Sequence, residues 1–230
     1  SQVCSRTSNK TVPPTSNHLH STLETMKRLF YILPILATLL FLTSCSENEE
    51  AGEYDNWQAR NQQYVDSIAQ LANSGRNGWS KMVAFNLVDS VESLNPNNNH
   101  YIYIQKLEQG KGNTHPLYTD SIRVHYMGRL IPSVSYPQGH IFGKSYSTYV
   151  FNEATDVPAL MAVNENIIGF STAIMHMVEG DRWKIVIPYY LGYGAAATLS
   201  NGIPGYSALT FDVKLARIYK YKGGADTTWH

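Results

Sequence analysis

The sequence of 230 residues is poor in charge and has no excess of either sign. Lys and Arg total 18, Asp and Glu also total 18, and charged residues make up only 16% of the chain. No basic run interleaved with aromatic residues supplies the positive field that binding to phosphates requires. We therefore expect no binding to nucleic acid. The 12% of aromatic residues supply enough apolar surface for a folded core, which excludes disorder of the whole chain.

Cysteine is also scarce, because Cys4 and Cys45 are the chain's two cysteines. A thiolate metal site needs more cysteines than this, and the eight histidines form no His-Glu-x-x-His motif. We expect neither a metal site nor any other cofactor.

A short apolar segment near the front has the features of an export signal. Residues 26–28 read Met-Lys-Arg, and residues 29–42 follow without a charge. This run is too short to cross a bilayer comfortably, and its order matches a secretory signal peptide. A buried core helix is the alternative, which Pro34 and the basic start disfavour. Residues 42–45 read Leu-Thr-Ser-Cys and resemble the bacterial lipobox, which implies cleavage before Cys45 and lipidation of that residue.

These features divide the chain into six expected segments. They are an upstream extension absent from the mature protein (1–25), a lipoprotein signal peptide (26–44), a polar linker (45–56), an N-terminal helical region (57–100), a main domain (101–222) and a tail (223–230). Ser46 after the cysteine resembles the pattern of lipoproteins sent to the outer membrane. We expect an envelope protein held on that membrane by its lipid, facing either the periplasm or the cell surface.

The N-terminal region begins with a pattern typical of one amphipathic helix. Apolar positions recur at helical spacing over residues 57–72, and Gly75 follows as a stop. The apolar stripe could dock on the main domain or pair with a second copy, and docking is the more frequent outcome for so short a helix. The oligomeric state therefore stays open.

The main domain has the period-two alternation of half-buried strands. Residues 101–104, 122–127, 183–187 and 209–215 alternate in this way, and a single helix is expected over Ser171–Val178, ended by Gly180. The predicted fold class is α+β, with a curved antiparallel β-sheet wrapped around one short α-helix.

Eight short motifs follow one another in this domain. They are Val124-His125-Tyr126-Met127-Gly128, Phe142 with Ser145, Ile167-Ile168-Gly169-Phe170, Met177 with Gly180, Ile187-Pro188, Gly192-Tyr193-Gly194, Ile203-Pro204 and Leu209-Thr210-Phe211-Asp212-Val213. Each motif alone is unspecific. Their order and spacing over about residues 101–222 resemble the FKBP-type peptidyl-prolyl cis-trans isomerases.

The resemblance implies a proline-binding pocket and assigns residues to it. Catalytic positions would be Tyr126, Phe142, Phe170, Tyr193 and Phe211, and substrate-binding positions would be Tyr149, Ile167 and Ile203. In this assignment Phe170 forms the floor, the Tyr193 hydroxyl points at a substrate carbonyl, and the Ile167 N–H donates to the carbonyl near the proline.

The implied function is isomerisation of X-Pro bonds in exported polypeptides, with the pocket also open to macrolide inhibitors of this family. Two departures motivate an alternative, a chaperone or binding module of the same fold with little or no isomerase activity. Gly143 stands where the family usually has an acidic residue, and Phe170 stands where it more often has Trp.

A serine hydrolase is a third interpretation. Residues 169–173 nearly match a nucleophile elbow around Ser171, and Asp212 and His230 would complete the order of a triad. The motif ends in Ala rather than Gly, and antiparallel strand patterns follow it, so we expect no hydrolase.

Overall fold

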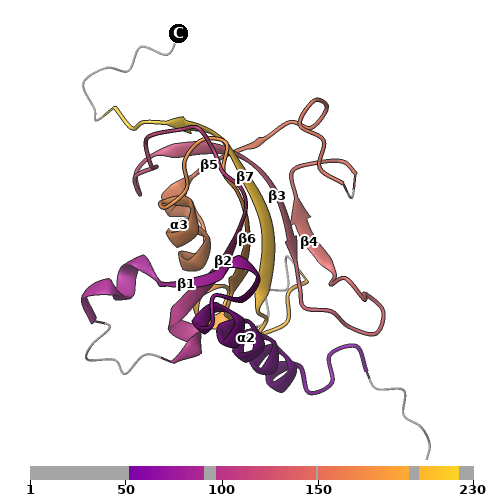
Figure 1. The fold of residues 1–230 in the computed structure, drawn as a ribbon. Helices are drawn as coiled ribbons and strands as arrows, with labels where there is room; N and C mark the ends of the chain where they lie inside the picture. The colour runs from indigo at the N-terminus through magenta and orange to yellow at the C-terminus, as the bar shows by residue number, and fades with distance from the viewer. Residues whose placement is uncertain (1–51, 91–96, 149, 197–201, 223–230) are drawn as a thin grey trace, which may run out of the picture. The chain divides into compact units, whose positions relative to one another are not determined.

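A computed structural model describes residues 52–90, 97–148, 150–196 and 202–222 (Figure 1). The expected signal peptide, the lipidation site Cys45, Tyr149 and His230 lie outside these residues. None of the helices in the described ranges is both long and apolar enough to cross a membrane.

The centre of the fold is a curved seven-stranded sheet whose pairings are all antiparallel. Its order is β1-β2-β6-β7-β3-β4, and β5 also pairs with β3. The strands are β1 (Trp79–Val83), β2 (Tyr101–Glu108), β3 (Ser121–Arg129), β4 (Ile141–Lys144), β5 (Ala159–Ala162), β6 (Arg182–Ile187) and β7 (Leu209–Tyr219).

The helix α3 (Ile168–Ile174) lies in the concavity of this sheet, as Figure 1 shows. Along β7, side chains are alternately buried and half-buried, so every second residue faces the helix. The buried set from β7, β6, β3 and α3 belongs to one hydrophobic core. The structure therefore confirms the predicted fold class of a curved antiparallel sheet around a short helix.

The helix α3 begins earlier and ends earlier than the expected span of Ser171–Val178. Ile167 is still extended, and its carbonyl accepts hydrogen bonds from the N–H groups of Phe170 and Ser171, which starts the helix at Ile168. The first turn also needs Gly169, because a Cβ there would lie 2.4 Å from a side-chain carbon of Ile187. This close packing against β6 fixes the first turn of the helix.

The helix α2 (Trp57–Asn73) begins where the sequence predicts and docks on the protein's own sheet. Val65 and Ala69 are buried in the common core. The Trp57 indole N–H donates to the Ser207 hydroxyl at 2.9 Å, and the Asn61 side-chain oxygen accepts from a backbone N–H just before β7 at 2.8 Å. Of the two predicted outcomes, docking on the main domain is the one observed.

The region 57–100 also holds a strand that the sequence does not predict. The strand β1 pairs with β2 in register from Trp79 opposite Gln105 to Val83 opposite Tyr101, so the sheet extends into this region. The remaining short elements are the 3-10 helices η1 (Arg76–Gly78), η2 (Phe85–Ser90), η3 (Asn98–His100), η4 (Val163–Glu165) and η5 (Tyr189–Leu191).

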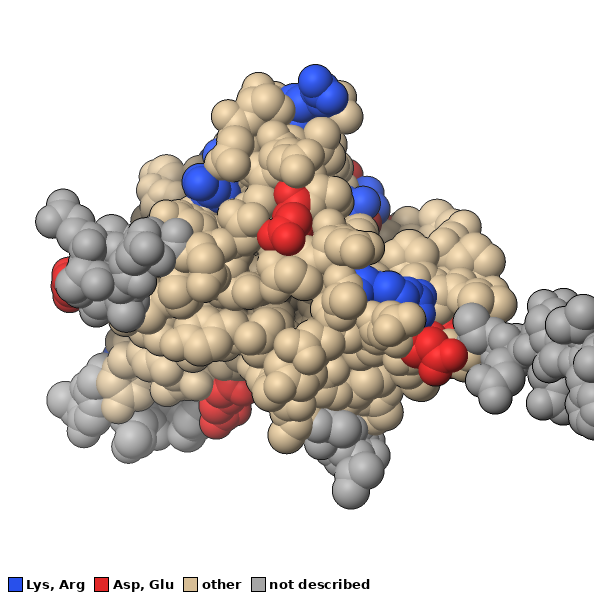
Figure 2. Space-filling view, turned by 90° about the horizontal axis from the view of Figure 1, so that it is seen from below, with Lys and Arg blue, Asp and Glu red and all other residues tan. Residues whose placement is uncertain are grey.

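Charged side chains of both signs are scattered over the face seen in Figure 2, without one dominant field.

Candidate functional site

Three phenyl rings from three different elements meet on the concave side of the sheet. Phe211 of β7 lies at the centre, with its ring centroid 5.2 Å from that of Phe170 in α3 and 5.5 Å from that of Phe142 in β4. Both contacts are edge to face, the arrangement that aromatic quadrupoles favour. Phe170 and Phe211 are only 3% and 5% exposed, whereas Phe142 is half-buried. The cluster thus has a buried floor and a more open side.

Gly128 makes room for this cluster. It pairs with Phe211 in the β3·β7 register, and a Cβ at this position would lie 2.5 Å from the Phe142 ring and 2.9 Å from the Phe211 ring. Any side chain there would displace the two rings. Gly128 belongs to one of the motifs in the sequence, but the reason for its presence becomes visible only in the folded sheet.

Tyr126 is held beside the cluster by Ser145, whose role the sequence does not reveal. The Tyr126 N–H donates to the Ser145 hydroxyl at 2.9 Å, and the Ser145 N–H donates to the Tyr126 carbonyl at 2.9 Å. Tyr126 is half-buried and packs against the core. Burial raises the pKa of the Tyr126 phenol, and the nearby Tyr193 raises it further, so the group stays a neutral hydrogen-bond donor at physiological pH.

Tyr193 is the exposed one among the predicted site residues that the structure describes. It follows η5 in a tight turn in which the N–H groups of Gly192 and Gly194 donate to the Tyr189 carbonyl at 3.1 and 2.9 Å. Gly194 has a φ of 82°, a conformation that favours glycine. The Tyr193 side chain is 38% exposed, and its phenol is close enough to Tyr126 to affect that residue's pKa.

Ile167 and Ile203 complete the apolar surroundings. Ile203 is buried at 1% exposure in the same core as Phe170 and Phe211, and Ile167 packs half-buried against that core. Among the described residues, no acceptor is found for the Ile167 N–H, although its carbonyl accepts two bonds from α3. The ring contacts bring Phe142, Phe170 and Phe211 together. Ile203 belongs to the same hydrophobic core, Ile167 and Tyr126 pack against it, and Tyr149 lies outside the described ranges.

Two further sequence features can be placed. Gly143 lies beside Tyr126, since a Cβ there would be 3.5 Å from the Tyr126 ring and 3.6 Å from its hydroxyl oxygen.

Ser171 is 1% exposed, and its hydroxyl donates to the Val163 carbonyl at 2.7 Å. A buried hydroxyl already engaged in this way has no access to a substrate, so the hydrolase interpretation fails.

No group of three or more His, Cys, Asp or Glu side chains suited to a metal ion occurs in the part of the chain that the structure describes. The described site offers apolar surfaces, two phenol hydroxyls and one backbone N–H. Such an arrangement can hold an apolar group and orient nearby carbonyls, and it contains no nucleophile in a reactive setting.

Comparison with known proteins gives a consistent result. Residues 112–216 match the family model of FKBP-type peptidyl-prolyl cis-trans isomerase. The macrophage infectivity potentiator of Trypanosoma cruzi is 35% identical over 117 residues, which is 51% of this chain and 53% of that protein. The FKBP-type 22 kDa peptidyl-prolyl cis-trans isomerase of Escherichia coli K12 is 36% identical over 112 residues, covering 49% and 47%.

A crystal structure of a peptidyl-prolyl cis-trans isomerase from Pseudomonas syringae pv. tomato str. DC3000 superposes with a TM-score of 0.49 at 20% identity, covering 71% of this chain and 96% of that one. The chain spans about half the length of the two curated relatives. The family match covers β3 to most of β7, which includes every described residue of the aromatic site. At residues 112–216 the chain carries a domain of the FKBP-type peptidyl-prolyl cis-trans isomerase family.

Proposed function

We propose that this protein catalyses cis–trans isomerisation of X-Pro bonds. The observation that carries the proposal is the edge-to-face cluster of Phe142, Phe170 and Phe211, in which Phe170 and Phe211 form a buried floor and Phe142 is half-buried. A proline ring is the kind of compact apolar group that such a surface accepts.

The chemistry that this site must perform is a bond rotation. The barrier of about 18–20 kcal/mol arises because the amide loses its resonance when it twists. The twisted amide is less charge-separated than the planar one, so surroundings made of phenyl rings and isoleucines favour the transition state over the bound substrate. No nucleophile, metal or proton donor takes part in the reaction.

Hydrogen bonds to the flanking carbonyls would add to this effect. Tyr193 offers a phenol hydroxyl on the open side of the cluster, and the Ile167 N–H is a donor without an acceptor among the described residues. Both groups would hold the substrate backbone in the twisted geometry, since fixed donors aimed at the transition state lower its free energy. Tyr149 would line the same pocket.

The place of action that we propose is the bacterial cell envelope, where the protein would be anchored by a lipid on Cys45 and would assist the folding of exported, proline-containing polypeptides. This part rests on the basic start and apolar run of residues 26–42 and on the lipobox-like residues 42–45. Replacement of Cys45 by Ala should abolish incorporation of labelled palmitate and release the protein from membranes. Unchanged labelling and retention would contradict the lipid anchor.

The activity is tested by the rate of a proline-limited refolding reaction with the full chain present. We expect acceleration that a macrolide ligand of this family abolishes, and a several-fold loss of activity in Tyr193→Phe, which removes one hydroxyl and little else. A folded protein that binds unfolded clients but leaves the refolding rate unchanged would instead favour the chaperone or binding module.

A further inference from the structure

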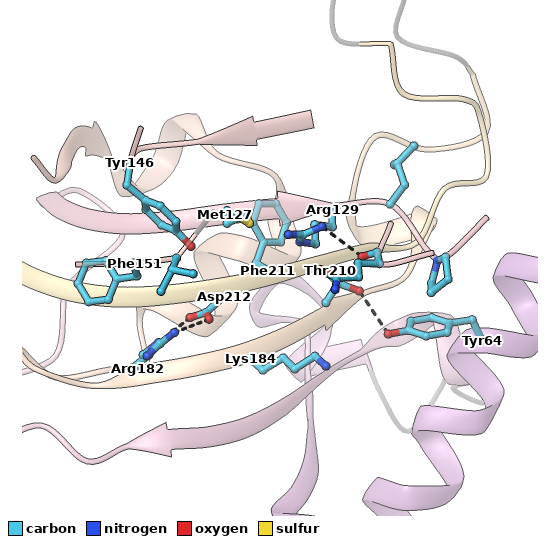
Figure 3. Close-up of a pocket in the computed structure, with 14 residues that line it drawn as sticks. Tyr64, Met127, Arg129, Tyr146, Phe151, Arg182, Lys184, Thr210, Phe211 and Asp212 are labelled. Carbon is cyan, nitrogen blue, oxygen red and sulfur yellow. Dashed lines mark hydrogen bonds and ion pairs between the residues drawn. The ribbon is translucent and has the colours of Figure 1, made fainter. Parts of the chain in front are cut away.

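A second concave site lies on the opposite face of the sheet from the aromatic cluster. Successive side chains of a strand point to opposite faces, so Thr210 and Asp212 of β7 face away from the side that Phe211 occupies. They open onto a cavity of about 510 Å³, within the range typical of ligand sites, which Phe211 between them also lines. Figure 3 shows its lining residues, which come from β3, β6, β7, the loops before and after β4 and the helix α2.

Positive charge dominates this cavity. Its charged lining residues are Arg129, Arg182, Lys184 and Asp212. Arg182 and Asp212 neutralise each other through two hydrogen bonds, from Nε at 2.9 Å and from an Nη at 2.8 Å. Both oxygens of the cavity's carboxylate are therefore occupied, and the charges of Arg129 and Lys184 remain.

Neither of these two cations has a carboxylate partner within ion-pair distance among the described residues. One Nη of Arg129 donates to the Gly139 carbonyl at 3.0 Å and to the Gln138 carbonyl at 3.4 Å, which leaves the Nε and the other Nη for a ligand. The Lys184 ammonium lies 5.9 Å from the centre of the Trp79 ring, at the outer limit of a cation–π contact. Both side chains are half-buried, so a bound anion would be screened less than on an open surface.

The strand register places these cations around a pair of hydroxyl groups. Arg129 on β3 is the cross-strand partner of Thr210 on β7. Lys184 on β6 is the cross-strand partner of Asp212, which follows Thr210 on the same face of β7. The Thr210 hydroxyl lies 3.4 Å from the Tyr64 hydroxyl of α2, at the long end of hydrogen-bond distances. Either group could turn to an incoming oxygen atom.

Apolar side chains form the rest of the wall. Met127, Val150 and Phe151 line the cavity beside the polar groups. The guanidinium carbon of Arg182 lies 5.5 Å from the centre of the Phe151 ring, so this ring lies at the same face of the sheet as Arg182. A ligand that fits must therefore combine a negative charge with an apolar group.

We propose that this outer-face cavity binds a polypeptide segment through the carboxylate of an acidic side chain next to an apolar one. Arg129 and Lys184 hold the carboxylate, Thr210 and Tyr64 donate to it, and Met127 and Phe151 contact the neighbouring apolar side chain. Charge-assisted hydrogen bonds of this kind are stronger than neutral ones.

A neighbouring hollow favours a polypeptide over a small free anion. It has a volume of about 470 Å³ and shares Arg129 and Gln138 with the first cavity. A chain bound by its carboxylate at Arg129 could continue into this hollow, where Tyr136 and Pro137 offer further apolar contact. A single carboxylate ion would leave both apolar regions empty.

The test is a titration of the full chain with acetyl-Phe-Glu-amide, which contains no proline, followed by amide chemical shifts in NMR. We expect saturable shifts at Met127, Thr210 and Lys184. The neutral acetyl-Phe-Gln-amide should bind about tenfold more weakly or worse, since a hydrogen bond to a charged group is worth about 1.5–3 kcal/mol. Added salt should weaken the acidic peptide alone.

Variants separate this cavity from general charge effects. Lys184→Gln should weaken the acidic peptide by about tenfold, as should Arg129→Gln, whereas the matched change Lys106→Gln on β2, outside the cavity, should have no effect. Equal affinity of the Glu and Gln peptides, or an unchanged affinity in Lys184→Gln with a native amide spectrum, would overturn the proposal. Equal binding of acetyl-Glu-amide, which lacks the apolar residue, would reassign the cavity to small carboxylates. The isomerase assay is independent of all these outcomes.

Discussion

Gly143 lies against the phenol of Tyr126. A Cβ at 143 would be 3.6 Å from the phenol oxygen, an ordinary contact distance. The family resemblance implies an acidic residue at this position that organises the pocket through a hydrogen bond. A side chain can therefore begin at this position without displacing Tyr126.

Replacement of Gly143 by Asp should accordingly increase isomerase activity. The carboxylate would accept a hydrogen bond from Tyr126 and fix the orientation of its ring, and we expect kcat/KM to rise by about three- to tenfold. The control is Gly143→Ala, which adds the Cβ without the acceptor. Equal activity of the Asp and Ala variants would show that the acidic residue has no such role in this chain.

Replacement of Gly128 by Ala should have the opposite effect. The new Cβ would fall 2.5 Å from the Phe142 ring, so the aromatic cluster must shift, at a cost of about 1–3 kcal/mol in the free energy of unfolding. Activity should fall as well, because the rings form the proposed site. Urea denaturation and the refolding assay measure the two effects.

Gly143→Ala serves as the matched control for this change too, because Gly143 is the direct cross-strand partner of Gly128 and a Cβ there has only ordinary contacts. If the two alanine variants were equally stable, the close approach at Gly128 would not constrain the cluster.

The outer face of β3 predicts a dependence of stability on pH. His125 is 5% exposed beneath the Phe151 ring, with centroids 4.6 Å apart, and its Nδ1 has no hydrogen-bond partner among the described residues. Burial lowers the pKa of His125, and this effect outweighs the nearby carboxylates of Asp156 and Glu153. The unfolded chain then binds a proton more readily than the folded one.

Stability should therefore decrease as the pH falls below about 6.5, the ordinary pKa of histidine, toward the lower value in the folded protein. Urea denaturation between pH 7.5 and 5 measures this decrease. His125→Leu should remove part of it, and His140→Gln, in the loop before β4, should leave it unchanged. A His125→Leu profile parallel to that of the parent protein would contradict the assignment.

Much of the sheet was predictable from the sequence because its strands are half-buried. Alternation along 209–215 reflects one face packed on α3 and one open to solvent. The motif order contains Phe142, Phe170 and Phe211, whose rings the structure brings into contact. The strand β1 escaped detection because Ser80 and Lys81 are both exposed, which breaks the alternation at this edge of the sheet.

The outer-face cavity could not be predicted from sequence at all. Arg129, Lys184 and Thr210 are far apart in the chain and carry no shared motif. Only the register of β3, β7 and β6 brings them to one face, and Tyr64 reaches them because α2 docks on the same domain. Function at such a place depends on tertiary pairing, which local patterns do not encode.

We propose that the cluster around Phe211 accelerates X-Pro isomerisation. The most direct test of this proposal compares a proline-limited refolding reaction in the presence of the full chain and of Phe170→Leu, with Lys106→Gln as a control far from the cluster. Leu keeps the site apolar but removes the ring that contacts Phe211, so we predict catalysis by the parent chain and Lys106→Gln and a loss of about tenfold in a folded Phe170→Leu variant. Absence of catalysis by the folded parent chain, or undiminished catalysis by Phe170→Leu, would contradict the account.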